Sequence, residues 1–390
     1  MFIIEIIIYV TFAWVMYYFV KLSYFKHPQN SRLDLYLFCA IFFWALVSGI
    51  RWGVGSDYFP YAWQFDQGML ENNLENRSHE VIWIWFVSLF NRLNIHYTVG
   101  MGIVAFMQMY FIFISLKSQK YLLLVLPIIL FAGWFNFILW GGMRQMLVAC
   151  VFVYISKWII ERKMWQYFLT LFLLHYIHNS ALILLPLYFF PRTLQLSDKR
   201  ILCLVVFFMC FIIGLTPKFQ YLISSLSNIA QIAGYTDYVE EISTKLSGDS
   251  EAETRAFGPT MLSYFLICCS TIIYSPKLKS RYGNIIPNFE LWYIFAYIYS
   301  CGFFLFSNTS HIFLRPISYF SLFLMLILSM LLFYFRENIK ENRIHYFLLK
   351  FILWMGIIWT IFKLSKIDSY NYITYKFFWN HSLYEILINN

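Results

Sequence analysis

The sequence predicts an all-α, polytopic integral membrane protein, and its composition, apolar segments and charge placement each support this fold class. Hydrophobic residues make up 61% of the 390-residue chain, and charged residues make up only 13%. A soluble chain of this length could not cover so much apolar surface with so few polar side chains. The apolar runs recur from end to end, so we expect a single polytopic membrane domain over residues 1–390 with about 10–13 apolar helices.

The apolar segments differ in length, which matters because a membrane-spanning helix needs about 20 apolar residues. Segment 81–93 is too short, so we expect an interfacial or re-entrant helix there. Segment 164–190 is too long and contains HYIHNS at 175–180, which predicts two shorter helices broken near His178. The first segment has no basic region and no small-residue cleavage site, which favours a retained span over a signal peptide. The expected segments are 2–20, 34–50, 81–93, 97–116, 120–140, 145–160, 164–190, 201–217, 259–275, 289–306, 311–335 and 345–363.

Charged residues between the segments predict how the chain is oriented. Six short linkers hold 17 Lys or Arg against 4 Asp or Glu, whereas two longer loops hold 5 Lys or Arg against 11 Asp or Glu. Base-rich loops stay in the cytoplasm, so we expect loops 51–80 and 218–257 to be external. Successive loops must alternate between the two sides of the membrane. This requires that segment 81–93 does not cross the membrane and that segment 164–190 crosses it as a broken pair. These are the same two segments whose lengths are anomalous. The base-rich linkers are 21–32, 117–120, 157–163, 192–200, 276–287 and 336–345.

Two features of the composition argue against other functions. The formal net charge is +9, but the basic residues lie in short loops beside apolar spans, which is a topology signal and not a nucleic-acid-binding surface. The seven cysteines form no CxxC or Cys/His pattern, and most lie within apolar runs. We therefore expect them to be small packing residues.

The stretch RWGVGSDYFPYAWQF at 51–65 directly follows an apolar segment, and its two glycines allow a sharp turn at the membrane surface. We expect the turn to place Asp57 near the interface with Arg51 close by. Four aromatic residues accompany this pair, namely Trp52, Tyr58, Tyr61 and Trp63. One interpretation is an aromatic belt with a surface ion pair. The other is a carboxylate held at the membrane surface, with aromatic rings that stack on sugars.

The sequence WGGMRQ at 140–145 places Arg144 between two apolar segments and behind a pair of glycines. Arginine is costly in this position and cannot act as a base. Its planar guanidinium is suited to hold phosphate through two hydrogen bonds, and Gln145 is a weaker candidate for a hydrogen bond beside it. The alternative is an arginine that reaches the lipid headgroups.

The sequence HYIHNSALILLP at 175–186 contains His175 and His178, which are three residues apart and could share a helix face. Histidine titrates near neutral pH, so either ring could act as an acid, a base or a hydrogen-bond donor to phosphate. The alternative is a pair of residues that hydrogen-bond between helices. We expect no metal site, because the pair lacks an HExxH glutamate and a nearby carboxylate.

Four landmarks in this order resemble the EpsG-like, Wzy-type family of bacterial polysaccharide polymerases: R-x-G-V-G-x-D-Y-x-x-Y, a glutamate that opens a helix, G-x-R-Q, and H-x-S-A-L-I-x-L-P. The resemblance implies a membrane C-type glycosyltransferase that joins lipid-pyrophosphate-linked oligosaccharide repeats at the external face of the bacterial inner membrane. The family's characteristic polar positions correspond to Arg51, Asp57, Glu80, Arg144 and His178. Its DYxxY tyrosines correspond to Tyr58 and Tyr61, and a later arginine corresponds, more weakly, to Arg315.

The implied reaction assigns roles to these residues. An acceptor hydroxyl attacks the anomeric carbon of a donor sugar on undecaprenyl pyrophosphate, so the protein must neutralise phosphate charge and activate a weak nucleophile. For phosphate we expect Arg144 with Arg51 or Arg315. The expected catalytic residues are Asp57, Glu80, His178 and Arg144, and the sequence leaves open which of the first three is the base. The expected substrate-binding residues are Arg51, Tyr58, Tyr61, Gln145, His175 and Arg315.

The expected partners are lipid-linked oligosaccharides as donor and acceptor, with no cofactor. A chain-length regulator and a flippase are candidate partner proteins. Two other functions stay open: a flippase or transporter of the same lipid-linked glycan, and a polysaccharide O-acyltransferase. A transporter would place basic residues at mid-bilayer along a path, whereas the distinctive Arg and His residues here gather at segment ends. The early His/Arg pair of the acyltransferases is absent from the sequence.

Overall fold

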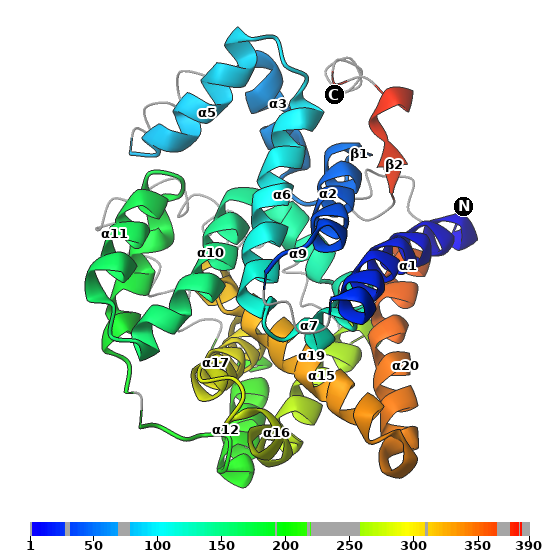
Figure 1. Cartoon of the computed structure of the whole chain (residues 1–390), viewed down its shortest axis with the longest axis vertical. Helices are drawn as coiled ribbons and strands as arrows, with labels where there is room; N and C mark the ends of the chain where they lie inside the picture. The colour runs from blue at the N-terminus through cyan, green and yellow to red at the C-terminus, as the bar shows by residue number, and fades with distance from the viewer. Residues whose placement is uncertain are drawn as a thin grey trace. The chain divides into compact units, whose positions relative to one another are not determined.

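The structure is a computed structural model, and its chain is built almost entirely from helices (Figure 1). It describes residues 2–27, 32–68, 79–191, 193–216, 219, 258–308, 311–364, 375–381 and 383. Most of the predicted external loop 218–257, and residues 69–78 of the predicted loop 51–80, lie outside the described residues. The chain divides into two compact units, Met1–Arg192 with Leu328–Asn390, and Thr193–Ile327.

The first unit combines long helices with short and broken ones. Its N-terminal elements are α1 (Phe2–Lys26), α2 (Leu35–Gly49), β1 (Arg51–Trp52), α3 (Tyr58–Gln67), α5 (Val81–Arg92), α6 (Tyr97–Leu116), α7 (Lys120–Leu123), α8 (Leu126–Ala132), α9 (Phe135–Gly141), α10 (Met143–Ile160), α11 (Met164–His175) and the 3-10 helix η1 (Asn179–Phe189). Its C-terminal elements are the last part of α19 (Ser321–Glu337), α20 (Ile339–Leu364), β2 (Lys376–Phe377) and the 3-10 helix η2 (Phe378–Asn380).

Both segments of anomalous length have the predicted form. Segment 81–93 is the 12-residue helix α5, too short to span a membrane as a straight helix. Segment 164–190 is two helices, because α11 ends at His175 and η1 begins at Asn179, with His178 in an extended conformation between them. The break near His178 is confirmed, as is a short helix over 81–93, whose interfacial or re-entrant position stays a prediction.

Close packing of α2 on α6 positions the turn that follows α2. A Cβ added to Gly49 would lie 2.6 Å from the Thr98 carbonyl oxygen and 3.4 Å from the Gly102 Cα. Small residues of this kind let two apolar helices approach closely. The contact holds the C-terminal end of α2 against the first turns of α6.

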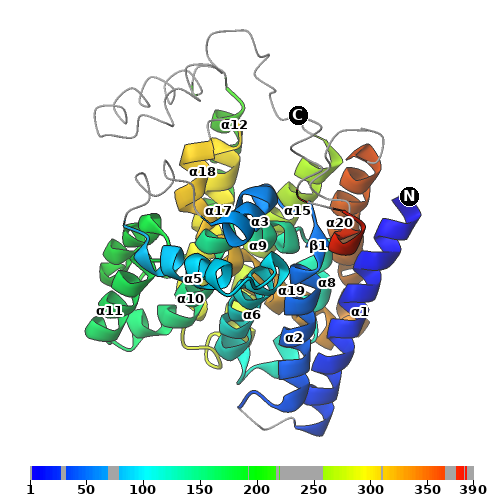
Figure 2. The ribbon, with the colours of Figure 1, turned by 90° about the horizontal axis from the view of Figure 1, so that it is seen from above.

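At the opposite end of α2, which runs beside α1 (Figure 2), a buried ion pair joins two linkers. Lys120 Nζ lies 2.7 Å from Asp34 Oδ2, which also accepts a hydrogen bond from Ser23 Oγ at 2.6 Å. Burial raises the pKa of Asp34, but the hydrogen bonds from Lys120 and Ser23 outweigh burial and lower the pKa below its ordinary value. Parts of the base-rich linkers 21–32 and 117–120 therefore meet at one end of the unit.

The apolar segment expected over 120–140 is present, but it is bent and not one continuous helix. Lys120–Ala132 and Phe135–Gly141 meet at a bend of 71°. The bend falls at Trp134, whose φ of 70° lies in the left-handed region of backbone conformation that residues other than glycine rarely adopt. Hydropathy follows side-chain type and does not record a single left-handed residue, so the segment looks continuous in the sequence.

The loop predicted over 51–80 also contains regular structure. Within it, α3 buries Tyr58, Tyr61, Ala62 and Phe65, a spacing typical of one helix face. Before α3, β1 pairs antiparallel with β2, with Arg51 opposite Phe377. A segment near the C-terminus therefore lies directly against the turn that follows α2 (Figure 1).

The second unit contains α12 (Arg200–Gly214), α15 (Pro259–Ile273), α16 (Ser275–Tyr282), α17 (Phe289–Phe306), α18 (His311–Ser318) and the first part of α19. Glu290 at the start of α17 accepts hydrogen bonds from Ser197 N at 3.0 Å and Ser197 Oγ at 2.5 Å. These bonds hold the segment before α12. A bend of 56° separates α15 from α16. Apart from Ser275, helix α16 occupies part of the predicted linker 276–287, where no helix was expected.

Five described helices are long and apolar enough to cross a membrane, or seven if each of the two bent pairs is one span. Four further apolar helices are shorter, among them α2 and α5. The predicted class, an all-α polytopic integral membrane protein with broken segments, is confirmed.

Candidate functional site

Arg51 is completely buried and connects three chain segments. Its Nε donates to the Val54 carbonyl at 3.0 Å, its Nη1 donates to the Ser48 carbonyl, and its Nη2 donates to the Trp140 carbonyl at 3.4 Å. Ser48 and Trp140 lie in the last turns of α2 and α9, whose carbonyls carry partial negative charge. Burial lowers the pKa of Arg51 to about 10, which keeps the side chain charged at neutral pH. The guanidinium of Arg51 thus donates to backbone carbonyls and to Met143 Sδ, and its expected role in substrate binding stays a prediction.

The turn before α3 packs tightly against the junction of α9 and α10. A Cβ on Gly55 would lie 2.7 Å from the Trp140 carbonyl oxygen, and a Cβ on Gly141 would lie 3.0 Å from Ser56 Oγ. Gly55 also has a φ of 106°, a conformation in which other residues are strained. Glycine at these two positions lets the turn touch the backbone just before Arg144.

Asp57 follows this contact and precedes α3. Its side chain is half-buried and forms no hydrogen bond or ion pair with another residue in the part of the chain that the structure describes. Tyr61, one turn further along α3, has its ring centre 5.7 Å from the guanidinium carbon of Arg144. Contacts at Ser56 and Tyr61 therefore bracket Asp57 and hold it near the N-terminal end of α10.

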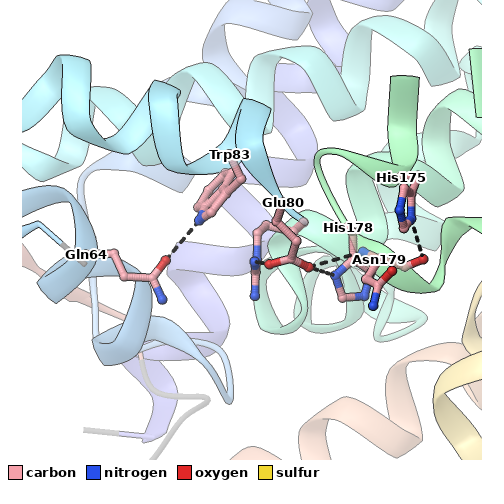
Figure 3. Close-up of polar contacts among 7 residues, drawn as sticks. Gln64, Glu80, Trp83, His175, His178 and Asn179 are labelled. Atoms are coloured by element: carbon pink, nitrogen blue, oxygen red, sulfur yellow. Dashed lines mark hydrogen bonds and ion pairs between the residues drawn. The ribbon is translucent and has the colours of Figure 1, made fainter. Parts of the chain in front are cut away.

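Three of the predicted catalytic residues form one cluster around the carboxylate of Glu80 (Figure 3). Glu80 Oε2 accepts a hydrogen bond from Arg144 Nη1. Glu80 Oε1 accepts one from His178 Nδ1 at 3.2 Å and one from Asn179 N at 3.1 Å. Glu80 is 4% exposed and Arg144 is 5% exposed, whereas the His178 side chain is 21% exposed. The cluster joins the starts of α5 and α10 to the α11–η1 break, and it is most accessible at His178.

The charge state of Glu80 follows from these partners. Burial raises the pKa of the carboxyl group, but His178, Arg144 and the Asn179 N–H together lower the pKa to about 2. An ionised carboxylate only accepts hydrogen bonds, so His178 Nδ1 is the donor in this pair. Glu80 is therefore a fixed anion that orients one cation and one imidazole.

Aromatic rings enclose Arg144. The ring centres of Tyr61 and Trp83 lie 5.7 and 5.4 Å from its guanidinium carbon, within range of cation–π attraction. Trp83 Nε1 donates to Gln64 Oε1 at 3.0 Å, which fixes the ring (Figure 3). Arg144 Nε is buried and has no hydrogen-bond partner among the described residues. The N-terminal end of α10 adds partial positive charge at the same place, so the arrangement favours an anion.

The other predicted residues lie outside the Glu80 cluster. His175 Nδ1 contacts the Asn179 carbonyl at 3.0 Å, and it does not share a helix face with His178 because α11 ends between them. Gln145 is buried on α10 beside Arg144. Arg315 is exposed on α18, in the second unit.

Three of the aromatic side chains in the 51–65 stretch are more deeply buried than we expected from the sequence. Trp52, Tyr58 and Tyr61 are 4%, 0% and 5% exposed. Their rings therefore contact protein, and neither the aromatic-belt nor the sugar-stacking interpretation fits these three side chains. Trp63 is half-buried.

Sequence analysis missed several members of the site, namely Gln64, Trp83, Trp140 and Asn179. A signal for Trp83 was present, because Trp83, Val87 and Phe90 recur at helical spacing and are the buried positions of α5. No comparable pattern marks Trp140, whose backbone contacts depend on the turn at Gly55. Among the described residues, no group of three His, Cys, Asp or Glu side chains is arranged to hold a metal ion.

Comparison with known proteins identifies the family. The family model of the EpsG family matches residues 34–377. No curated protein and no solved structure matches the chain significantly. The matched region starts just before α2, contains the whole Glu80 cluster and ends with β2. Because the match covers most of the sequence and agrees with the four ordered landmarks, the chain belongs to the EpsG family.

Proposed function

We propose that the chain is a polysaccharide polymerase, a membrane glycosyltransferase that joins undecaprenyl-pyrophosphate-linked oligosaccharide repeats at the external face of the bacterial inner membrane. Membership of the EpsG family supports a polymerase-like role in general terms. The observation that carries the proposal is the convergence of Glu80, Arg144 and His178 beside the turn that holds Asp57.

The proposed reaction needs a cationic site for its leaving group. The acceptor hydroxyl oxygen bonds to the anomeric carbon of the donor sugar, the bond from that carbon to pyrophosphate breaks, and its electron pair leaves with the lipid pyrophosphate. Arg144 suits this anion because its Nε is unpartnered among the described residues and because it lies at the N-terminal end of α10. When its ring is protonated, His178, held by the same carboxylate through Nδ1, donates a second hydrogen bond to phosphate from Nε2.

The proton of the acceptor hydroxyl must pass to a base, and Asp57 fits this role better than Glu80. Both oxygens of Glu80 accept hydrogen bonds, and its pKa of about 2 makes it a weak base. Asp57 is half-buried, and its carboxylate makes no hydrogen bond within the described chain. We therefore assign Asp57 as the base and Glu80 as a positioning residue for Arg144 and His178.

The positions of the charges support a polymerase over a flippase. Arg51 lies two residues after the end of α2, Glu80 directly precedes the first residue of α5, and Arg144 is the second residue of α10. A transport path would place such residues along the middle of the helices. Their place at helix ends supports a site near one membrane face.

The test is the near-isosteric change Asp57→Asn in the purified chain, reconstituted in lipid nanodiscs with lipid-linked repeats isolated from the host. We expect polymer formation to fall by roughly 10²–10⁴-fold, because the variant keeps one carbonyl acceptor but loses the proton-accepting carboxylate. Asp66→Asn is the matched control, since Asp66 is also half-buried on α3 and its carboxylate accepts a hydrogen bond from Gln67 Nε2 at 2.8 Å. The control should form polymer at the wild-type rate.

Cells provide a second readout that separates the two functions. Cells with Asp57→Asn should accumulate single lipid-linked repeats in the external leaflet, since the donor is still made and exported. Repeats trapped in the cytoplasmic leaflet would identify a flippase and contradict the proposal. Wild-type polymer from a normally abundant Asp57→Asn protein would remove Asp57 as the base and leave His178 in that role.

A further inference from the structure

The segment Tyr375–His381, here named the C-terminal strap, is fastened to the turn that follows α2. Its strand β2 pairs with β1, Phe378 N donates to the Ile50 carbonyl at 3.0 Å, and Tyr375 Oη donates to the Val47 carbonyl at 2.5 Å. The ring of His381 stacks on Trp52 at 5.3 Å and 12°. The strap is thus held at several points to the part of the chain that leads into Asp57.

The strap presents one large aromatic face to the outside. Trp379 is 58% exposed, yet its ring is held in a fixed orientation by parallel stacking on Phe377 at 4.5 Å and 16°. Lys376, on the same strap, is exposed as well. An exposed lysine on the same strap points to a polar setting for that segment, because an ammonium group in hydrocarbon is costly.

We propose that the exposed face of Trp379 is a stacking platform for a pyranose ring of the glycan, an inference that rests on the polymerase function proposed above. A pyranose has one face rich in C–H groups and hydroxyls around its rim. The electron-rich face of an indole attracts such C–H groups and leaves the hydroxyls in water.

Three observations favour a sugar as the occupant. The rings of Trp52, Tyr58 and Tyr61 in the 51–65 stretch are buried, whereas the ring of Trp379 on the neighbouring strap is exposed. The Trp379 face is planar and backed by Phe377, which suits a flat ring better than a flexible acyl chain. The strap is also continuous, through β1, with the turn that carries the proposed base.

The proposal is tested by the binding of lipid-free oligosaccharides, prepared by mild acid cleavage of the host's own polysaccharide, to the full-length chain in nanodiscs. We expect Trp379→Leu to raise the dissociation constant about 10-fold, which corresponds to about 1.4 kcal/mol. Trp379→Phe keeps a flat ring and should restore most of the affinity. Trp85→Leu is the control, because Trp85 is 64% exposed but lies on α5, away from the strap.

The outcomes separate a sugar platform from a membrane anchor. A leucine retains apolar surface, so an anchoring tryptophan would tolerate Trp379→Leu in oligosaccharide binding. Wild-type affinity in Trp379→Leu, or an equal loss in the Leu and Phe variants, overturns the proposal. Oligosaccharide binding by a wild-type chain that makes no polymer would refute the polymerase function and leave the platform standing. If the wild-type chain forms polymer and Trp379→Leu binds oligosaccharide with wild-type affinity, the platform is refuted and the polymerase function stands.

Discussion

Replacing Glu80 by glutamine tests whether this carboxylate organises the site. Glutamine is nearly isosteric with glutamate, so packing around the side chain should persist. The change removes the negative charge that faces Arg144 Nη1 and His178 Nδ1. We expect a folded but less stable chain in which Arg144 and His178 are no longer held in place.

The pKa of Glu80 indicates the size of the effect. The partners lower the pKa from 4.5 to about 2, and one pKa unit corresponds to about 1.36 kcal/mol. The carboxylate therefore contributes about 3 kcal/mol to the free energy of unfolding at neutral pH, similar to the roughly 3–5 kcal/mol lost when a buried ion pair is broken. Because the folded-state pKa is the lower one, this stability is complete above about pH 4.5 and is lost as the pH falls toward 2.

The assay compares Glu80→Gln with Asp34→Asn in purified protein, by thermal unfolding and by polymer formation per folded molecule. Asp34 pairs with Lys120 in a similarly buried ion pair at the other end of α2. Both variants should unfold at lower temperature, and the difference between wild type and Glu80→Gln should narrow below pH 4.5. Only Glu80→Gln should lose turnover in the folded fraction.

Two results would refute this reasoning. Wild-type unfolding and turnover in Glu80→Gln would mean that the cluster contributes neither stability nor orientation. Equal loss of turnover in both variants would mean that Glu80 acts only through general stability.

Three further predictions address geometry and topology. Arg144→Lys should lose most polymer on a gel at unchanged membrane abundance, because lysine keeps the charge but lacks the planar fork that binds a carboxylate and a phosphate together; normal polymer would show that charge alone suffices. Tyr375→Phe removes the hydrogen bond to the Val47 carbonyl and should lower the free energy of unfolding by about 1 kcal/mol, measured by denaturant unfolding, and an unchanged midpoint would show that the strap is not fastened there. A membrane-impermeant thiol reagent should label Asn72→Cys and Ser247→Cys in intact cells, and labelling only after permeabilisation would reverse the predicted orientation.

Much of the fold and part of the site could be predicted from the sequence. Apolar segment lengths and linker charges predicted both the helical membrane class and the two irregular segments, because hydropathy and charge are properties of each residue. The order of the landmarks was enough to nominate Glu80, Arg144 and His178, which the structure brings into one cluster. These residues are polar in otherwise apolar surroundings, so they are visible without knowledge of their contacts.

The burial of the 51–65 stretch could not be predicted in this way. It depends on contacts with residues far along the chain, such as the Trp140 carbonyl that receives Arg51 and the strap residue Tyr375 that reaches back to Val47. Hydropathy does not record which distant segment will cover a turn. The bend at Trp134 was missed for a similar reason, since it depends on one backbone dihedral angle.

Arg51 and Arg144, both buried in the first unit, illustrate how the partners of an arginine decide which of its donors are left for a ligand. Arg51 donates to carbonyls at the C-terminal ends of α2 and α9, and each helix end carries roughly half a negative charge, so its charge is largely offset by the fold itself. Arg144 is offset by Glu80 but lies at the positive end of α10 and keeps an unpartnered Nε within the described structure. A phosphate in this region would therefore meet an N–H donor without a partner among the described residues, and a positive helix end, at Arg144, whereas Arg51 directs its donors at backbone carbonyls. The bonds of Arg51 to the Ser48, Val54 and Trp140 carbonyls fasten the turn that holds Asp57, so we expect loss of Arg51 to release that turn.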